Sequence, residues 1–219
     1  MASDRRALLA GATGLVGRAL LPLLLRSHAA VEVLARRAVD LGSDPRLHLH
    51  VVDFAALPKP LPRVDDVFIA LGTTIKVAGS QAAFRSVDLD AVVATARAAR
   101  EAGATRLGVV SALGADAASS VFYNRVKGEM EAALATLGYA SVTIARPSLL
   151  LGDRAALGQP VRRVEAWAMR LAPAIMGLVP RSMRPIRAAD VAAGLVDSVR
   201  AAEPGVRILA SAQMQPGGG

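Results

Sequence analysis

The sequence predicts an α/β fold: a doubly wound parallel sheet with helices on both faces, followed by a small C-terminal lobe. Short apolar runs, typical of strands that are buried on both faces, alternate along the chain with longer helical segments. Composition then shifts after Asp153, where arginine dominates the charged residues. We therefore expect a single domain over residues 1–219, with a core over about 1–153, a helical lobe over about 154–210 and a flexible tail over 213–219.

Six apolar runs predict the strands of this sheet. They lie at residues 7–10, 31–35, 47–52, 67–71, 107–110 and 141–145. Apolar residues at helical spacing predict helices at 14–26, 81–102 and 119–137, and a further helix that begins near residue 185. Gly103 and Gly138 follow two of these segments, as glycine commonly does where a helix ends.

Composition and charge exclude several classes of protein. The 219 residues contain no cysteine, so neither a disulfide framework nor a thiol nucleophile is available. The formal net charge is +8, but only 3% of residues are aromatic, and we expect no nucleic-acid partner. We find no targeting segment and no apolar run long enough to span a membrane, and so expect a cytoplasmic protein without a membrane partner.

A glycine-rich turn joins the first strand to the first helix. Gly11, Gly14 and Gly17 form the pattern G-x-x-G-x-x-G, which suits a tight turn, a close approach to a pyrophosphate and close packing of helix on strand. An ordinary glycine turn is the alternative. On the dinucleotide interpretation, the phosphates lie against the following residues: Gly11, Ala12, Thr13, Gly14, Leu15 and Val16.

Two arginines indicate which dinucleotide the turn would bind. Arg36 and Arg37 follow the second strand, where an NAD enzyme carries a carboxylate for the ribose. Guanidinium groups suit a 2′-phosphate, so we expect NADP (NADPH), with a solvated arginine pair as the alternative. After the third strand, Asp53 and Phe54 are a candidate contact for adenine, although a turn-forming aspartate explains Asp53 equally well.

A serine, a tyrosine and a lysine form the candidate catalytic group. Tyr123 and Lys127 are spaced i, i+4 on a predicted helix, so the phenol and the ammonium share a face. The cation favours the phenolate form of the tyrosine. Ser111 ends the preceding strand, at the edge of the sheet where α/β proteins bind ligands.

These motifs, in this order, resemble the short-chain dehydrogenase/reductase superfamily, a group with a Rossmann fold. The chain is most similar to its atypical short members, in the HIV Tat-interactive-protein oxidoreductase branch, over about residues 7–154. Besides the glycine turn and the Ser-Tyr-Lys group, the resemblance rests on Leu71-Gly72-Thr73-Thr74, Val87-Asp88-Leu89-Asp90, Lys127-Gly128-Glu129 and Arg146-Pro147.

The resemblance implies a role for each of these residues. Tyr123 would give or take the proton, Lys127 would hold the nicotinamide ribose, and Ser111 would position the reacting carbonyl. Asp88 and Asp90 stand where classical members carry the asparagine of a proton relay. Further cofactor contacts would come from Leu71, Gly72, Thr73, Thr74, Pro147, Leu149 and Leu150.

Two functional hypotheses follow. The first is an NADP(H)-dependent oxidoreductase acting on a small carbonyl or alcohol, as a monomer or homodimer. Arginines after Asp153 favour an anionic substrate, or they form a solvated basic surface. The second is a non-catalytic NADPH-binding regulator or redox sensor that acts through a protein partner. We expect no metal site, because His28, His48 and His50 lack neighbouring ligands at metal-binding spacing.

Overall fold

The computed structural model describes residues 3–151 and 180–216. Their centre is a sheet in the order β3-β2-β1-β4-β5-β6-β9, and all six neighbouring pairs are parallel. This arrangement confirms the expected doubly wound α/β fold. The strands are β1 (Ser3–Ala10), β2 (His28–Ala35), β3 (Leu47–Val51), β4 (Asp66–Ile69), β5 (Arg106–Val110), β6 (Ser141–Arg146) and β9 (Gly205–Ala210).

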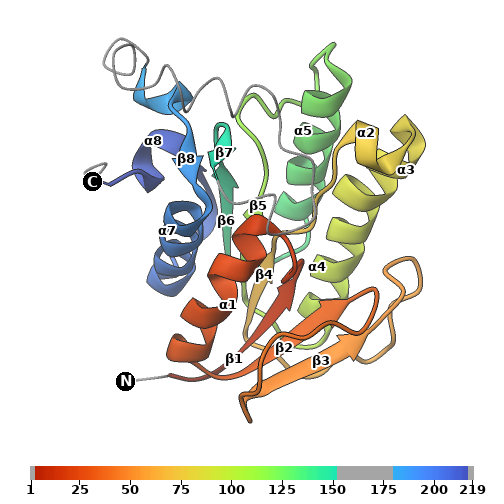
Figure 1. The fold of residues 1–219 in the computed structure, drawn as a ribbon, viewed down its shortest axis with the longest axis vertical. Helices are drawn as coiled ribbons and strands as arrows, with labels where there is room; N and C mark the ends of the chain where they lie inside the picture. The colour runs from red at the N-terminus through yellow and green to blue at the C-terminus, as the bar shows by residue number, and fades with distance from the viewer. Residues whose placement is uncertain (1–2, 152–179, 217–219) are drawn as a thin grey trace.

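Helices cover both faces of the sheet (Figure 1). On one face, α1 (Leu15–Ser27) and α7 (Ala188–Ala201) pack against each other and share a core around Leu20 and Leu195. On the other face, α4 (Ala91–Glu101) and α5 (Phe122–Ala135) enclose a second core that contains Phe84. Both sets of helices bury the apolar stripes that predicted them.

The single helix expected over residues 81–102 is interrupted. It consists of α3 (Gln81–Arg85), a π-helical turn η1 (Ser86–Asp90) and α4. The wider turn carries Asp88 into the protein, where its side chain is buried. Such π-turns are frequent at functional sites, and hydrophobic spacing alone does not reveal them.

The C-terminal part corrects the expected division of the chain. Strand β9 pairs with β6 along its whole length, from Ser141 opposite Gly205 to Arg146 opposite Ala210. Helix α7 packs so closely on β5 that a Cβ on Gly108 would lie 2.7 Å from Val199 Cγ2. Strand β9 therefore completes the central sheet and α7 packs on it, so residues 188–210 do not form a separate lobe. The rest of the expected lobe, residues 154–179, lies outside the described residues.

Shorter elements tie this C-terminal part to the end of β6. Strand β7 (Leu150–Leu151) pairs in parallel with β8 (Ile186–Arg187), and a 3₁₀ turn, η3 (Arg181–Met183), precedes β8. Helix α8 (Ser211–Met214) follows β9 and buries Met214. Gln213 and Met214, the first residues of the expected tail, belong to this helix, and residues 217–219 lie outside the described residues.

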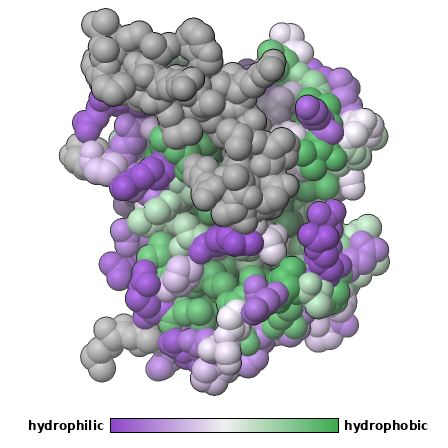
Figure 2. All heavy atoms as spheres, viewed as in Figure 1, coloured by the Kyte–Doolittle hydropathy of each residue, from purple (hydrophilic) through white to green (hydrophobic). Residues whose placement is uncertain are grey.

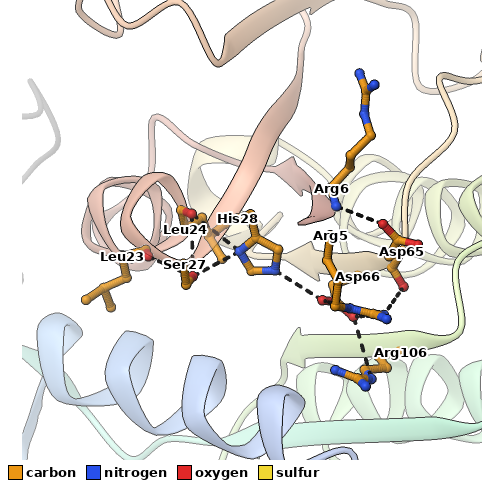
Figure 3. Close-up of polar contacts among 9 residues, drawn as sticks. All are labelled: Arg5, Arg6, Leu23, Leu24, Ser27, His28, Asp65, Asp66 and Arg106. Carbon is orange, nitrogen blue, oxygen red and sulfur yellow. Dashed lines mark hydrogen bonds and ion pairs between the residues drawn. The ribbon is translucent and has the colours of Figure 1, made fainter. Parts of the chain in front are cut away.

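A charged cluster closes the amino ends of the strands, opposite the glycine turn (Figure 3). Arg5 donates to both carboxylate oxygens of buried Asp66, at 2.8 and 2.6 Å, and His28 Nε2 lies 3.1 Å from Asp66 Oδ2. Burial alone would raise the pKa of Asp66, but the hydrogen bonds from Arg5 and His28 outweigh it and lower that pKa. The cluster joins the first residues of β2 and β4 to β1.

The surface of the molecule is mixed in character. Figure 2 shows hydrophilic and hydrophobic side chains interspersed on one face of the molecule. Within residues 3–151 and 180–216, no helix combines the length and hydropathy that crossing a membrane requires.

Candidate functional site

The glycine turn after β1 is built by close backbone contacts. Gly11 has a φ of +94°, and a Cβ at this residue would lie 2.5 Å from the carbonyl carbon of Ala70 at the end of β4. A Cβ on Gly17 would lie 1.9 Å from the Gly11 carbonyl oxygen. Only glycine fits at these two positions, because any larger residue would displace backbone.

The start of α1 leaves room and donors for a phosphate. Gly14 is the N-cap residue and has no side chain to cap the helix, so within the described residues no N-cap side chain accepts from the first N–H groups of α1. A Cβ on Gly14 would be accommodated without a clash, with its nearest neighbour, Gly11 O, in ordinary contact at 3.5 Å. Thr13 is exposed, whereas Ala12 and Val16 are buried. Uncapped donors beside an open glycine surface fit a dinucleotide pyrophosphate.

Arg36 and Arg37 lie just beyond the carboxyl end of β2, at the same edge of the sheet as the glycine turn. Both are exposed, and neither has a hydrogen-bond or ion-pair partner among the residues that the structure describes. Two unpaired guanidinium groups at this edge could bind an anionic group of a ligand.

The residues after β3 are used within the protein. Asp53 Oδ1 accepts a hydrogen bond from Ala55 N at 2.9 Å, which is the turn-forming role given above as the alternative. The Phe54 side chain is buried in the core beneath α4. Asp53 is exposed, whereas Phe54 is not, and the adenine contact stays a prediction.

The loop after β4 lies between the glycine turn and the candidate catalytic helix. Leu71 packs against the core, and Thr74 caps the short helix α2 (Ile75–Ala78) by accepting from Val77 N. Thr73 N donates to Asp88 Oδ2 at 2.8 Å. A Cβ on Gly72 would lie 3.4 Å from the other Asp88 oxygen, Oδ1. The loop therefore lies directly against Asp88.

Lys127 forms a buried ion pair with Asp88. Its Nζ lies 2.7 Å from Asp88 Oδ1, and both side chains are almost inaccessible to solvent. One turn earlier on α5, Tyr123 is half-buried and packs on Phe84, with ring centroids 5.5 Å apart. The Tyr123 hydroxyl has no hydrogen-bond partner within the described parts of the chain. A free hydroxyl on the same helix face as a buried cation suits proton transfer.

Asp88 and Asp90 differ in their surroundings, although the sequence made both of them candidates for the same position. Asp88 holds Lys127, whereas Asp90 is exposed. Of these two acids, Asp88 is therefore the one whose carboxylate contacts Lys127.

Ser111, at the end of β5, is also held by an acid. Its hydroxyl donates to Glu131 Oε1, and Arg146 binds Glu131 through Nε at 3.0 Å and Nη2 at 2.5 Å. Sequence reasoning missed Glu131 and the role of Arg146. The available signal was the position of Glu131 four residues after Lys127, which places it one turn further along α5.

The segment after β6 is fixed by backbone pairing. Pro147 O accepts from Leu113 N, and Leu149 O accepts from Ile186 N, both at 2.9 Å. Leu150 begins β7 and pairs with Ile186. This segment thus lies beside the loop after Ser111 and leads away from the same edge of the sheet.

A groove of about 540 Å³ lies beside α5 over β6 and β9. Gly128, Glu131 and Arg146 line it together with Val206 and Ile208. Among residues 3–151 and 180–216, no group of three or more His, Cys, Asp or Glu side chains is placed to hold a metal ion. His50 instead contacts buried Glu32, with Nε2 2.7 Å from Oε2.

Fold and glycine turn together define a Rossmann-type dinucleotide-binding protein. The family model described as NAD(P)H-binding matches residues 11–164. This chain therefore belongs to the NAD(P)H-binding family, as the sequence resemblance implied.

Curated relatives agree with this family. Protein FMP52, mitochondrial, of Debaryomyces hansenii is 36% identical over 154 residues, which are 68% of each chain. Protein HTATIP2 of Rattus norvegicus is 34% identical over 151 residues, covering 66% of this chain and 62% of the relative. The names of the FMP52 relatives place those proteins in mitochondria, which contradicts the cytoplasmic location that we expected.

Solved structures show the same fold. MoeE5 in complex with UDP-glucose and NAD superposes with a TM-score of 0.69 at 18% identity, covering 93% of this chain and 75% of that chain. The human epimerase family protein SDR39U1 with NADPH gives a TM-score of 0.63 at 20% identity, covering 94% and 74%. At these identities the similarity concerns the fold alone.

Proposed function

We propose that this NAD(P)H-binding protein is an NADP(H)-dependent oxidoreductase that acts on a small carbonyl or alcohol through Ser111, Tyr123 and Lys127. The observation that carries the proposal is a continuous set of contacts. Gly11 abuts the end of β4, the loop after β4 abuts Asp88, and Asp88 holds Lys127. The candidate dinucleotide turn and the candidate catalytic helix are thereby joined at one edge of the sheet.

Each residue has a role that its surroundings support. When bound, the nicotinamide cofactor would supply or accept the hydride. Tyr123, whose hydroxyl has no partner among residues 3–151 and 180–216, would give a proton to a carbonyl oxygen or take one from an alcohol. Lys127 would place a positive charge beside Tyr123 and donate to the ribose. Arg36 and Arg37 would bind the 2′-phosphate, which supports NADP over NAD.

The test replaces Tyr123 by phenylalanine. A positioned acid or base contributes about 10² to 10⁴ in rate, so Tyr123→Phe should lose turnover by that factor while NADPH binding, measured by fluorescence titration, is retained. The chain contains two tyrosines, which gives a matched control. Tyr139 lies in the core and donates to Ala96 O, so Tyr139→Phe should lower stability and leave the rate unchanged.

A panel of aldehydes and ketones with NADPH completes this test. Consumption of NADPH that depends on Tyr123 supports the oxidoreductase. Tight NADPH binding without turnover on any of them would instead support the non-catalytic regulator.

A further inference from the structure

The hydroxyl of Ser111 carries one proton, and in this structure it donates that proton in a hydrogen bond to Glu131. Both side chains are buried, Ser111 at 5% and Glu131 at 6% exposure, so water does not compete for the contact. A serine hydroxyl has one donor and two acceptor positions. Once the donor is used, only lone pairs remain for a ligand.

Arg146 forms a two-pronged ion pair with Glu131. Its guanidinium contacts both carboxylate oxygens, with Nε 3.2 Å and Nη2 2.5 Å from Oε2 and Nε 3.0 Å from Oε1. Hydrogen bonding to Glu131 raises the pKa of Arg146, so the arginine keeps its charge. Both carboxylate oxygens of Glu131 thus accept from Arg146, and Oε1 also accepts from the Ser111 hydroxyl. The direction of the Ser111–Glu131 bond is therefore fixed, with serine as donor.

We propose that Glu131 is a positioning residue that holds the Ser111 proton and turns Ser111 Oγ toward the site as a hydrogen-bond acceptor. This inference deepens the proposed function and rests on it for the class of substrate. A ligand that meets Ser111 must bring its own donor, as the hydroxyl of an alcohol does. The oxygen of a ketone or aldehyde would face lone pairs at Ser111 and receive its hydrogen bond from Tyr123.

A double-mutant cycle measures the Ser111–Glu131 contact without any substrate. Urea unfolding is recorded for the full chain, Ser111→Ala, Glu131→Gln and the double variant. Glu131→Gln also weakens the contact with Arg146, but it does so in both backgrounds, so that loss cancels. Because a hydrogen bond to an ionised group is stronger than a neutral one, the unfolding constant should rise about fivefold more when Ser111 is present. Equal effects in both backgrounds would overturn the proposal.

A second measurement tests the acceptor role. Cyclohexanol and tetrahydropyran are rings of similar size, and only the alcohol can donate a hydrogen bond. Neither is reduced by NADPH, so their dissociation constants can be measured by titration of the NADPH-loaded protein. The full chain should bind cyclohexanol several-fold more tightly, and Glu131→Gln should reduce that ratio. Equal affinity of the full chain for both rings would overturn the acceptor role.

Leu134→Ala provides the matched control. Leu134 is buried in α5, one turn after Glu131, and its truncation lowers stability without touching Ser111. In Leu134→Ala the ratio of cyclohexanol to tetrahydropyran affinity should equal that of the full chain. If Glu131→Gln acted only by lowering stability, it too would leave this ratio unchanged. If no carbonyl compound were turned over, the proposed oxidoreductase activity would be contradicted. The double-mutant cycle of unfolding would still test the Ser111–Glu131 contact, because it needs no substrate.

Discussion

Lys127 and Asp88 form an ion pair inside the protein, with 2.7 Å between Nζ and Oδ1 and side-chain exposures of 4% and 1%. Removing one partner of a buried pair leaves an uncompensated charge. We therefore expect Asp88→Ala to lower the free energy of unfolding by about 3 to 5 kcal/mol, measured by urea denaturation. Asp90→Ala is the control, because Asp90 is exposed on the same π-helical turn and its loss should cost less than about 0.5 kcal/mol. Similar losses for the two variants would contradict a special role for the pair.

Two glycines of the turn allow an effect on packing to be measured separately from an effect on cofactor binding. Gly17→Ala places a Cβ 1.9 Å from Gly11 O, so backbone must move, and we expect a loss of about 1 to 3 kcal/mol in stability. Gly14→Ala meets nothing closer than 3.5 Å and should keep its stability. Its methyl group would instead stand where the phosphates approach, so NADPH affinity should fall. Urea unfolding and fluorescence titration distinguish the two, and a Gly14→Ala protein that binds NADPH normally would argue against a phosphate at this turn.

The arginine pair after β2 should discriminate between cofactors. Replacing both Arg36 and Arg37 by alanine removes two donors for a 2′-phosphate, and we expect NADPH affinity to fall about 10- to 100-fold while NADH affinity is unchanged. Arg26→Ala/Arg97→Ala removes the same charge from exposed positions on α1 and α4 and should alter neither affinity. If the dissociation constant for NADPH did not change in the Arg36→Ala/Arg37→Ala variant, the predicted preference for NADP would be wrong.

The cluster at the amino ends of the strands predicts a loss of stability in acid. The pKa of Asp66 is lowered below its ordinary value of 3.8 in the folded protein. Its stabilising contribution is therefore complete above about pH 4 and is lost as the pH falls through the lower folded value. At pH 7, Asp66→Asn should cost about 3 kcal/mol, and this difference should shrink as the pH drops below 4. Exposed Asp197→Asn should behave like the parent at every pH.

Much of the fold could be predicted from the sequence, because β1, β2, β4 and β6 are short apolar runs buried on both faces. Strand β9 was missed for a physical reason. It is an edge strand that leaves Val206 and Ile208 exposed, so it lacks a continuous buried run. The π-turn at 86–90 was missed because it adds one residue to a helix whose apolar spacing otherwise continues.

The candidate site was predictable where geometry follows from spacing along the chain. The i, i+4 relation of Tyr123 and Lys127 and the position of Ser111 at a strand end are of this kind. The partners Asp88, Glu131 and Arg146 come from separate elements, and their pairing depends on how α5 packs beside η1 and β6. Such contacts between distant residues are not encoded in local spacing.

The packing of α7 on α1 has a consequence for how the protein is made. The ribosome synthesises α1 well before α7, because α7 begins more than 160 residues after the end of α1, and α7 covers the apolar residues Leu20 and Leu24 of α1. At a synthesis rate of roughly 5–20 residues per second, the nascent chain therefore exposes this surface for about ten seconds or more before α7 is made. Binding by a chaperone during that interval would protect the first helix until residues 188–210 emerge and complete the sheet.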